Sequence, residues 1–211
     1  RPHAKALVDA LVDVKDANAT AAVLHAAAGA DSRTLRRAAM SQLHRVRSPR
    51  VVEVLSAALE TDDDGLQMAA HRALGDVDHR RLLGPLSEAA SRSEGRVRAG
   101  LLTALGGIYD KQAVEVLAGY ALEANAPDGE ITESPVRPAA IRALGRSWRP
   151  ESVDVLVELL GQDDRAIRYL AAEAMGVKAG QIRRHIGNWG TRERHYAAVL
   201  KRSRPLRRAT D

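Results

Sequence analysis

The chain has no cysteine among its 211 residues, which excludes disulfides, thiolate metal sites and cysteine nucleophiles. It has no phenylalanine and only two tryptophans, so a folded core has to be built from leucine, valine, isoleucine and alanine. No apolar run approaches the ~18 residues that cross a membrane, and no signal peptide is visible. These absences favour a cytoplasmic protein that makes no contact with membranes.

Motifs that carry catalysis are also missing. The sequence has no Gly-rich phosphate loop, nucleotide fingerprint or Gly-x-Ser-x-Gly elbow, and its seven histidines show no metal-ligand spacing. Segment 61–65 holds three aspartates and a glycine, but it lacks the alternating ligands of a calcium loop. We predict that it forms a capping turn. We therefore predict no catalytic residue, no metal and no cofactor, although residues converging from distant segments leave an enzyme open.

What the sequence does contain is an internal repeat. The segment 136–145 returns as segment 167–176, 31 residues later, and related segments lie upstream. Six copies share a leucine or methionine at one position, and in the first five a second leucine follows 12 or 13 residues further on. The first column is Leu11, Leu43, Leu74, Leu105, Leu144 and Met175, and the second is Leu24, Leu55, Leu86, Leu117 and Leu156. Self-similarity at this period predicts a repeat array.

Each copy is predicted to form two short helices, called A and B here. In helix A the apolar residues fall at i, i+4 and i+8, and in helix B at i, i+3 and i+7, so each helix has one apolar face. Gly75, Gly106, Gly145 and Gly176 follow the first column and are expected to form left-handed caps. Pro85 lies next to Leu86 within a B segment, so we expect a late helix start or a kink there.

This pattern resembles the HEAT-repeat superfamily, and most closely the short bacterial repeats of the phycobilin-lyase type. The resemblance rests on the segments 97–106, 136–145 and 167–176. It implies an all-α fold, a right-handed α-α superhelix of five to six two-helix repeats over residues 1–178. A basic C-terminal helical tail is predicted over 179–211. The resemblance also implies that the B helices line the concave face, where partners bind.

Charge is distributed unevenly along the chain. Residues 178–211 have a net charge of +8 and residues 1–177 a net charge of −3. The repeat pattern ends after segment 165–176, and a further helix is predicted over 191–201. The tail could contact an anionic partner such as nucleic acid, and its candidate residues are Arg183, Arg184, Arg192 and Arg194. Trp189 and Tyr196 are too few for a base-stacking platform.

Within the repeats, the B segments are mildly acidic. The candidate partner-binding residues on the concave face are Glu53, Glu88, Glu115, Asp154 and Glu158. Acids in these positions favour a protein or peptide partner that has basic side chains. The A segments share an arginine column, which we interpret as a structural ladder pairing with the preceding loops. It comprises Arg36, Arg98, Arg137 and Arg168, and we expect it to break at Gln67.

The leading hypothesis is a non-catalytic scaffold that binds a protein or peptide along the concave B-helix face. The alternatives are nucleic-acid binding through the tail and a bilin-lyase-like HEAT protein, the latter implied only by the resemblance. An insertion of eight residues near 124–135 is predicted to form an exposed loop. The chain begins with arginine, so membership of a longer chain or a complex stays open, as do the oligomeric state and the partner's identity.

Overall fold

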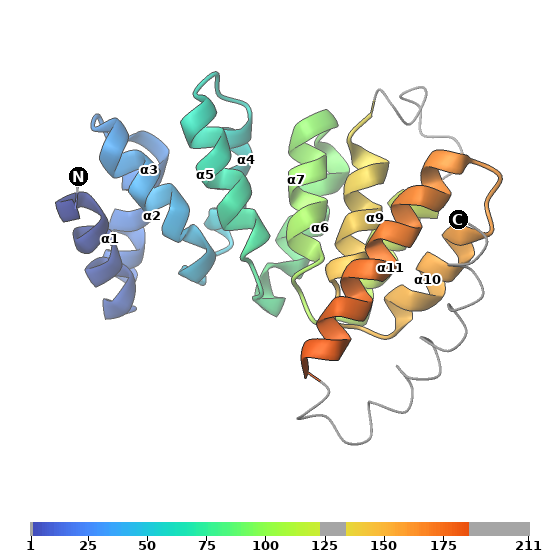
Figure 1. Cartoon of the computed structure of the whole chain (residues 1–211). Coiled ribbons are helices and arrows are strands. Elements are labelled where there is room, and N and C mark those ends of the chain that lie inside the picture. Colours follow the sequence, from blue (N-terminus) through green and yellow to red (C-terminus); the bar gives the residue numbers. More distant parts are fainter. Residues whose placement is uncertain (1, 123–133, 186–211) are drawn as a thin grey trace. The chain divides into compact units, whose positions relative to one another are not determined.

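The computed structural model describes residues 2–122 and 134–185 (Figure 1). In this part of the chain it contains helices and turns without strands, which confirms the all-α prediction. The A helices are α1 (Pro2–Val14), α3 (Arg33–Gln42), α5 (Asp64–Gly75), α7 (Gly95–Leu105), α9 (Val136–Arg146) and α11 (Arg165–His185). The B helices are α2 (Ala17–Gly29), α4 (Arg50–Leu59), α6 (Leu83–Arg92), α8 (Lys111–Leu122) and α10 (Glu151–Leu160). Short 3-10 turns at Leu43–Arg45 and Arg80–Leu82 precede α4 and α6.

The helices form two compact units. Unit 1 ends at Ile108 and contains α1 to α7, and unit 2 begins at Tyr109 and contains α8 to α11. The predicted division at 178/179 stays a prediction, because residues 186–211 lie outside the described part of the chain. Most of the insertion, residues 123–133, also lies outside it, as does the helix predicted over 191–201.

The leucines of the repeat form the core of each unit. In unit 1, Leu43, Leu55, Leu74 and Leu86 are completely buried, where α3 packs on α5 and α4 packs on both α5 and α6. In unit 2 the same columns place Leu117, Leu144 and Leu156 in the core, where α9 packs against α8, α10 and α11 (Figure 1). Burying one such side chain contributes about 1.5–3 kcal/mol, so the repeat spacing itself specifies most of the packing.

The glycines that follow the A-helix column do not form the predicted left-handed caps. Gly106 has a φ of −63°, and among the described glycines only Gly95 has a positive φ. The reason for the glycine at 145 is close packing, since a Cβ there would lie 2.8 Å from the Cα of Ala174 on α11. The left-handed prediction is therefore wrong, and contact between neighbouring A helices explains Gly145 instead.

Two helix ends differ from a simple repeat. The late start expected at Pro85 is confirmed, because α6 begins at Leu83 and Pro85 falls in its first turn, where a missing N–H costs nothing. The predicted end near Gly176 is wrong, because α11 continues to His185. In the described residues, no helix has the length and apolar character needed to cross a membrane.

Candidate functional site

Arginines near the start of the A helices donate to carbonyls at the end of the preceding B helix. In unit 1, Arg36 donates from Nε and Nη2 to Ala30 O at 3.1 and 2.8 Å. Arg98 donates from Nε to Ala90 O at 3.0 Å. The last carbonyls of a helix have no intrahelical partner, so each guanidinium satisfies a helix end and fixes the next A helix against it.

The same arrangement recurs in unit 2. Arg137, which is 9% exposed, donates from Nε to Ala121 O at 2.9 Å and from Nη2 to Gln162 Oε1 at 2.7 Å. Arg168 donates from Nη1 to Gln162 O at 2.9 Å, in the connection just after α10. The bond to Ala121 joins the end of α8 to the start of α9, on either side of the inserted segment.

The interruption expected at Gln67 is not found. Gln67 Nε2 donates to Thr61 O, the carbonyl six residues earlier, which is the same separation as between Arg36 and Ala30. A neutral amide N–H thus replaces the guanidinium without loss of the contact. The prediction was wrong because it counted charge, whereas the acceptor is a carbonyl that needs only a donor.

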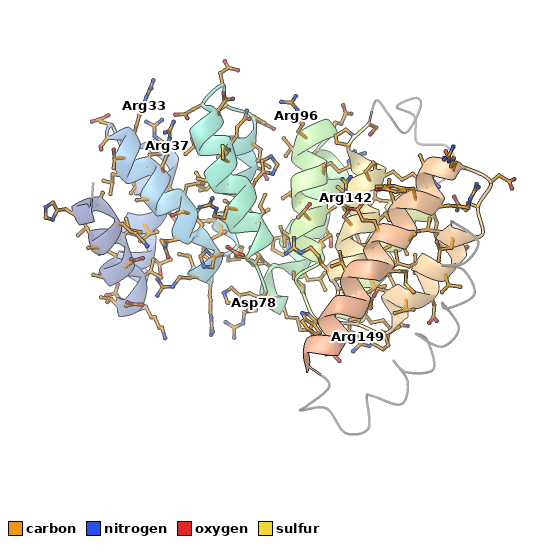
Figure 2. The ribbon with its side chains drawn as sticks, viewed as in Figure 1. Arg33, Arg37, Asp78, Arg96, Arg142 and Arg149 are labelled. Atoms are coloured by element: carbon orange, nitrogen blue, oxygen red, sulfur yellow. The ribbon has the colours of Figure 1, made fainter. Side chains whose placement is uncertain are left out.

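The segment that joins α4 to α5 has the capping role predicted for it. Asp63 accepts from Leu66 N at 3.0 Å, and its Oδ1 lies 2.6 Å from Arg37 Nη2. Figure 2 labels Arg37 on α3. The Arg37 guanidinium holds the pKa of Asp63 below its usual value. In the described part of the chain, no three His, Asp or Glu side chains gather to hold a metal ion.

The outward faces of the B helices have an unusual composition. These faces are the positions two residues before and two after the buried leucine of each B helix, and we call them the B-face positions. In unit 1 they are Ala22, Ala26, Glu53, Ala57, Gly84 and Glu88, and in unit 2 they are Glu115, Gly119, Asp154 and Glu158. All are exposed except Ala26, which is half-buried. Acidic residues, alanine and glycine thus fill every one of them.

The structure places all five predicted acids on these faces. Glu88 pairs with Arg92, and Glu115 Oε1 lies 3.1 Å from Lys111 Nζ. Among the described residues, Glu53, Asp154 and Glu158 make no ion pair. Three of the five carboxylates are thus available to a partner. Asp154 and Glu158 are also four residues apart on α10, a separation at which like charges repel.

A slot opens on the B face of unit 1, between α2 and α4. Its volume is about 240 Å³. Four alanines of the two helices line it, together with the buried side chains of Met40 and Leu66, and Glu53 also lines it. The alanines are Ala27, Ala28, Ala57 and Ala58. Small side chains at facing positions leave this space unfilled.

A larger groove in unit 1, of about 840 Å³, is lined by the turns that precede α2 and α4 and by residues 76–79. Arg45 pairs there with Asp13 and also with Asp9, at 3.5 Å, outside the lining, and Lys15 of the lining has a φ of 58°. Its volume suits a small molecule, but such sites are mostly apolar. Charges of both signs line this groove, so it is the weaker candidate.

A third surface lies on the A helices of unit 2. A shallow pocket of about 540 Å³ between α9 and α11 is lined by Pro138, Arg142, Arg165 and Tyr169 among others, and Tyr169 is 71% exposed. Figure 2 marks Arg142 on α9. This pocket lies outside the B face.

Sequence reasoning missed Lys178, a cation in the second half of α11 that is only 3% exposed. Its Nζ donates to Arg149 O at 3.1 Å, to Ser152 Oγ at 2.5 Å and to Ser147 O. Burial lowers the pKa of Lys178 to about 7, and the carboxylate of Glu151 raises it. The repeat column contained the signal, because three buried apolar residues precede two polar ones in it. The column is Val46, Val77, Ile108, Ser147 and Lys178.

The turn that Lys178 holds has a second polar contact. Arg149, in the turn between α9 and α10 (Figure 2), donates from Nε to Glu151 Oε2 at 3.1 Å. Its guanidinium carbon lies 5.0 Å from the ring centroid of Tyr109, a cation–π distance.

Of the arginines predicted for the tail, Arg183 and Arg184 belong to the last turns of α11, and Arg192 and Arg194 lie outside the described residues.

Comparison with known proteins identifies the repeats. The family described as HEAT repeats matches residues 130–185, and the PBS lyase HEAT-like repeat matches residues 35–61. Among curated proteins nothing matches. Similar solved structures include an engineered protein, with 18% identity, a TM-score of 0.38 and coverage of 84% of this chain and 89% of that one. Human deoxyhypusine hydroxylase in complex with glycerol shows 17% identity, a TM-score of 0.42 and coverage of 84% and 79%. The two matched segments are therefore HEAT repeats, which confirms the resemblance inferred from the sequence.

Proposed function

We propose that this protein is a non-catalytic scaffold that binds a protein or peptide on the B faces of its helices. The observation that carries the proposal is the composition of the ten B-face positions, which hold five acids and five alanines or glycines. HEAT repeats commonly mediate protein interactions, so the family match supports the same class of function.

The small residues indicate close approach by a partner. Gly119 lies inside α8, where a glycine costs about 0.5–1 kcal/mol relative to alanine. A Cβ at Gly119 would meet no atom within 4 Å, and the same is true at Gly84. Neighbouring helices therefore do not require either glycine. A partner whose main chain lies against the helices would give them a role.

The acids indicate the charge of the partner. Asp154 and Glu158 repel each other by about 0.2–0.5 kcal/mol at this spacing, and no described cation pairs with either. Basic side chains from a partner would remove this repulsion and add charge-assisted contacts. We therefore expect the partner segment to be rich in lysine or arginine.

The test is a quantitative pull-down from lysate of the source cells with the full chain carrying Asp154→Lys and Glu158→Lys. The matched control reverses two exposed acids of unit 2 outside the B face, Asp163→Lys and Glu173→Lys. We expect the first variant to lose its protein partners and the control to retain them. Equal capture by both variants would contradict the proposal.

The second candidate function is nucleic-acid binding through the tail, which the net charge of +7 over residues 179–211 favours. A version that ends at His185 tests it and keeps α11 complete. Nucleic acid that co-purifies only with the full chain, and is lost as salt is raised, would support this function instead. The match to a lyase-type repeat is compatible with a bilin-lyase-like protein, which the pull-down would reveal as capture of a phycobiliprotein.

A further inference from the structure

We infer that the slot between α2 and α4 receives a lysine or arginine side chain of the partner, with its cationic head on Glu53. This inference rests on the proposed function and names one contact within it. The observations that carry it are the shape of the slot, its aliphatic lining and the position of one carboxylate.

The lining fits the hydrocarbon part of such a side chain. Met40, Ala27 and Ala58 are buried and form the base of the slot, while Ala28 and Ala57 are exposed at its mouth. No aromatic ring lines it. Lysine and arginine bury their methylene stems along apolar surfaces of this kind while their charged heads stay near water.

Glu53 fits the charged part. Its side chain is exposed at the slot and has no ion-pair partner among the described residues. The other polar side chain of the lining, Thr61, donates from Oγ1 to Ala58 O at 2.9 Å, and its carbonyl accepts from Gln67. The Glu53 carboxylate is therefore the group in the slot that a ligand can pair with.

The same geometry argues against a neutral apolar occupant. A leucine or norleucine side chain would fill the slot but would remove water from Glu53 without replacing its hydrogen bonds, which is unfavourable. An acidic side chain would repel it. A long cationic side chain satisfies both the aliphatic walls and the carboxylate.

The experiment follows the alanine methyl groups by NMR in the full chain, labelled with ¹³C at alanine, as Nα-acetyl-lysine methylamide is added. We expect the methyl resonances of Ala57 and Ala58 to shift saturably as the lysine compound is added. The affinity for Nα-acetyl-norleucine methylamide should be at least tenfold weaker. Glu53→Gln should weaken lysine binding about tenfold, and Ala57→Leu should abolish the shift at Ala58 by filling the slot.

Two controls keep the outcome interpretable. Ala22→Leu adds the same side chain at another exposed B-face position outside the slot and should leave lysine binding unchanged. Glu88→Gln removes a carboxylate already paired with Arg92 and should also have no effect. Thermal unfolding of each variant establishes that it is folded.

Equal affinity for the lysine and norleucine compounds would overturn the inference, as would lysine binding that Glu53→Gln leaves intact. Either result, combined with lost capture in the Asp154 and Glu158 variant, would remove the slot but keep the proposed function. If lysine binds at the slot but the Asp154 and Glu158 variant still captures its protein partners, the proposed function is contradicted and the inference about the slot is not.

Discussion

Lys178 is the residue in the described structure whose ionisation should affect stability most directly. Its ammonium donates to three oxygens of the turn 147–152, an arrangement that favours the charged form. Burial opposes this and lowers the pKa from 10.5 to about 7. The unfolded chain therefore binds more protons than the folded chain between those two pH values, and stability should rise with pH across this window.

We predict that the free energy of unfolding of the wild type falls by about 2–3 kcal/mol between pH 9 and pH 6 relative to that of Lys178→Met, at 1.36 kcal/mol per pKa unit. The stabilisation is fully present above pH 10.5 and is lost as pH falls toward 7. Urea denaturation at four pH values measures it. Parallel pH profiles for the two proteins would show that the three acceptors and Glu151 outweigh burial and keep the lysine charged.

Single residues also show how far the sequence alone leads. The arginine column was visible as a pattern, and so was its gap at Gln67. The pattern could not show that the shared acceptor is a backbone carbonyl, because such acceptors leave no trace in side-chain identity. Lys178 was missed for a different reason, since a lone lysine near a basic tail is usually solvated, although the equivalent residues Val46, Val77 and Ile108 are apolar and buried.

At the scale of helices, Gly145 and Gly119 differ in whether packing requires a glycine. Gly145 lies on α9 against Ala174, where an added Cβ would come within 2.8 Å of the neighbouring helix. Gly119 lies inside α8 with open space around the same position. The first glycine is required by packing within unit 2, and the second lowers the helix propensity of α8 without such a requirement.

We therefore predict opposite effects of alanine at these two positions. Gly119→Ala should raise the free energy of unfolding by about 0.5–1 kcal/mol, because alanine is the better helix former and meets no obstacle. Gly145→Ala should lower it by about 1–3 kcal/mol through overpacking. Chemical denaturation checks both, and destabilisation by Gly119→Ala would contradict the claim that no internal contact needs this glycine.

The repeat predicted the positions of the helices well because a spacing of 31 residues and buried leucines determine them jointly. It could not predict the length of α11. The glycines equivalent to Gly176 lie at or next to the ends of earlier A helices, whereas α11 continues to His185. The slot was equally invisible, because it depends on which alanines of α2 and α4 face each other. The B-face acids were identified from sequence, but their availability depends on local pairs such as that of Glu115 with Lys111.

At the scale of the whole molecule, acids and bases are segregated. The described connections from B to A helices, residues 30–32, 60–63, 93–94 and 161–164, contain seven acids and no lysine or arginine. Negative charge at the start of each A helix stabilises the helix dipole, and Asp164 accepts from Ala166 N at 2.7 Å in this way. The excess of positive charge lies instead in the C-terminal residues. The repeats should therefore attract cationic partners, and the tail should attract anionic ones.

Removing residues 186–211 takes away seven bases and two acids and brings the formal net charge from +5 to 0. We predict that this truncation speeds association with a lysine-rich octapeptide several-fold at 20 mM salt, because like-charge repulsion at long range is removed. The difference should vanish near 300 mM salt, where the screening length falls to about 6 Å. Stopped-flow fluorescence with labelled peptide measures the rates. Slower association after truncation would mean that the tail takes part in peptide capture, which the B-face proposal does not allow.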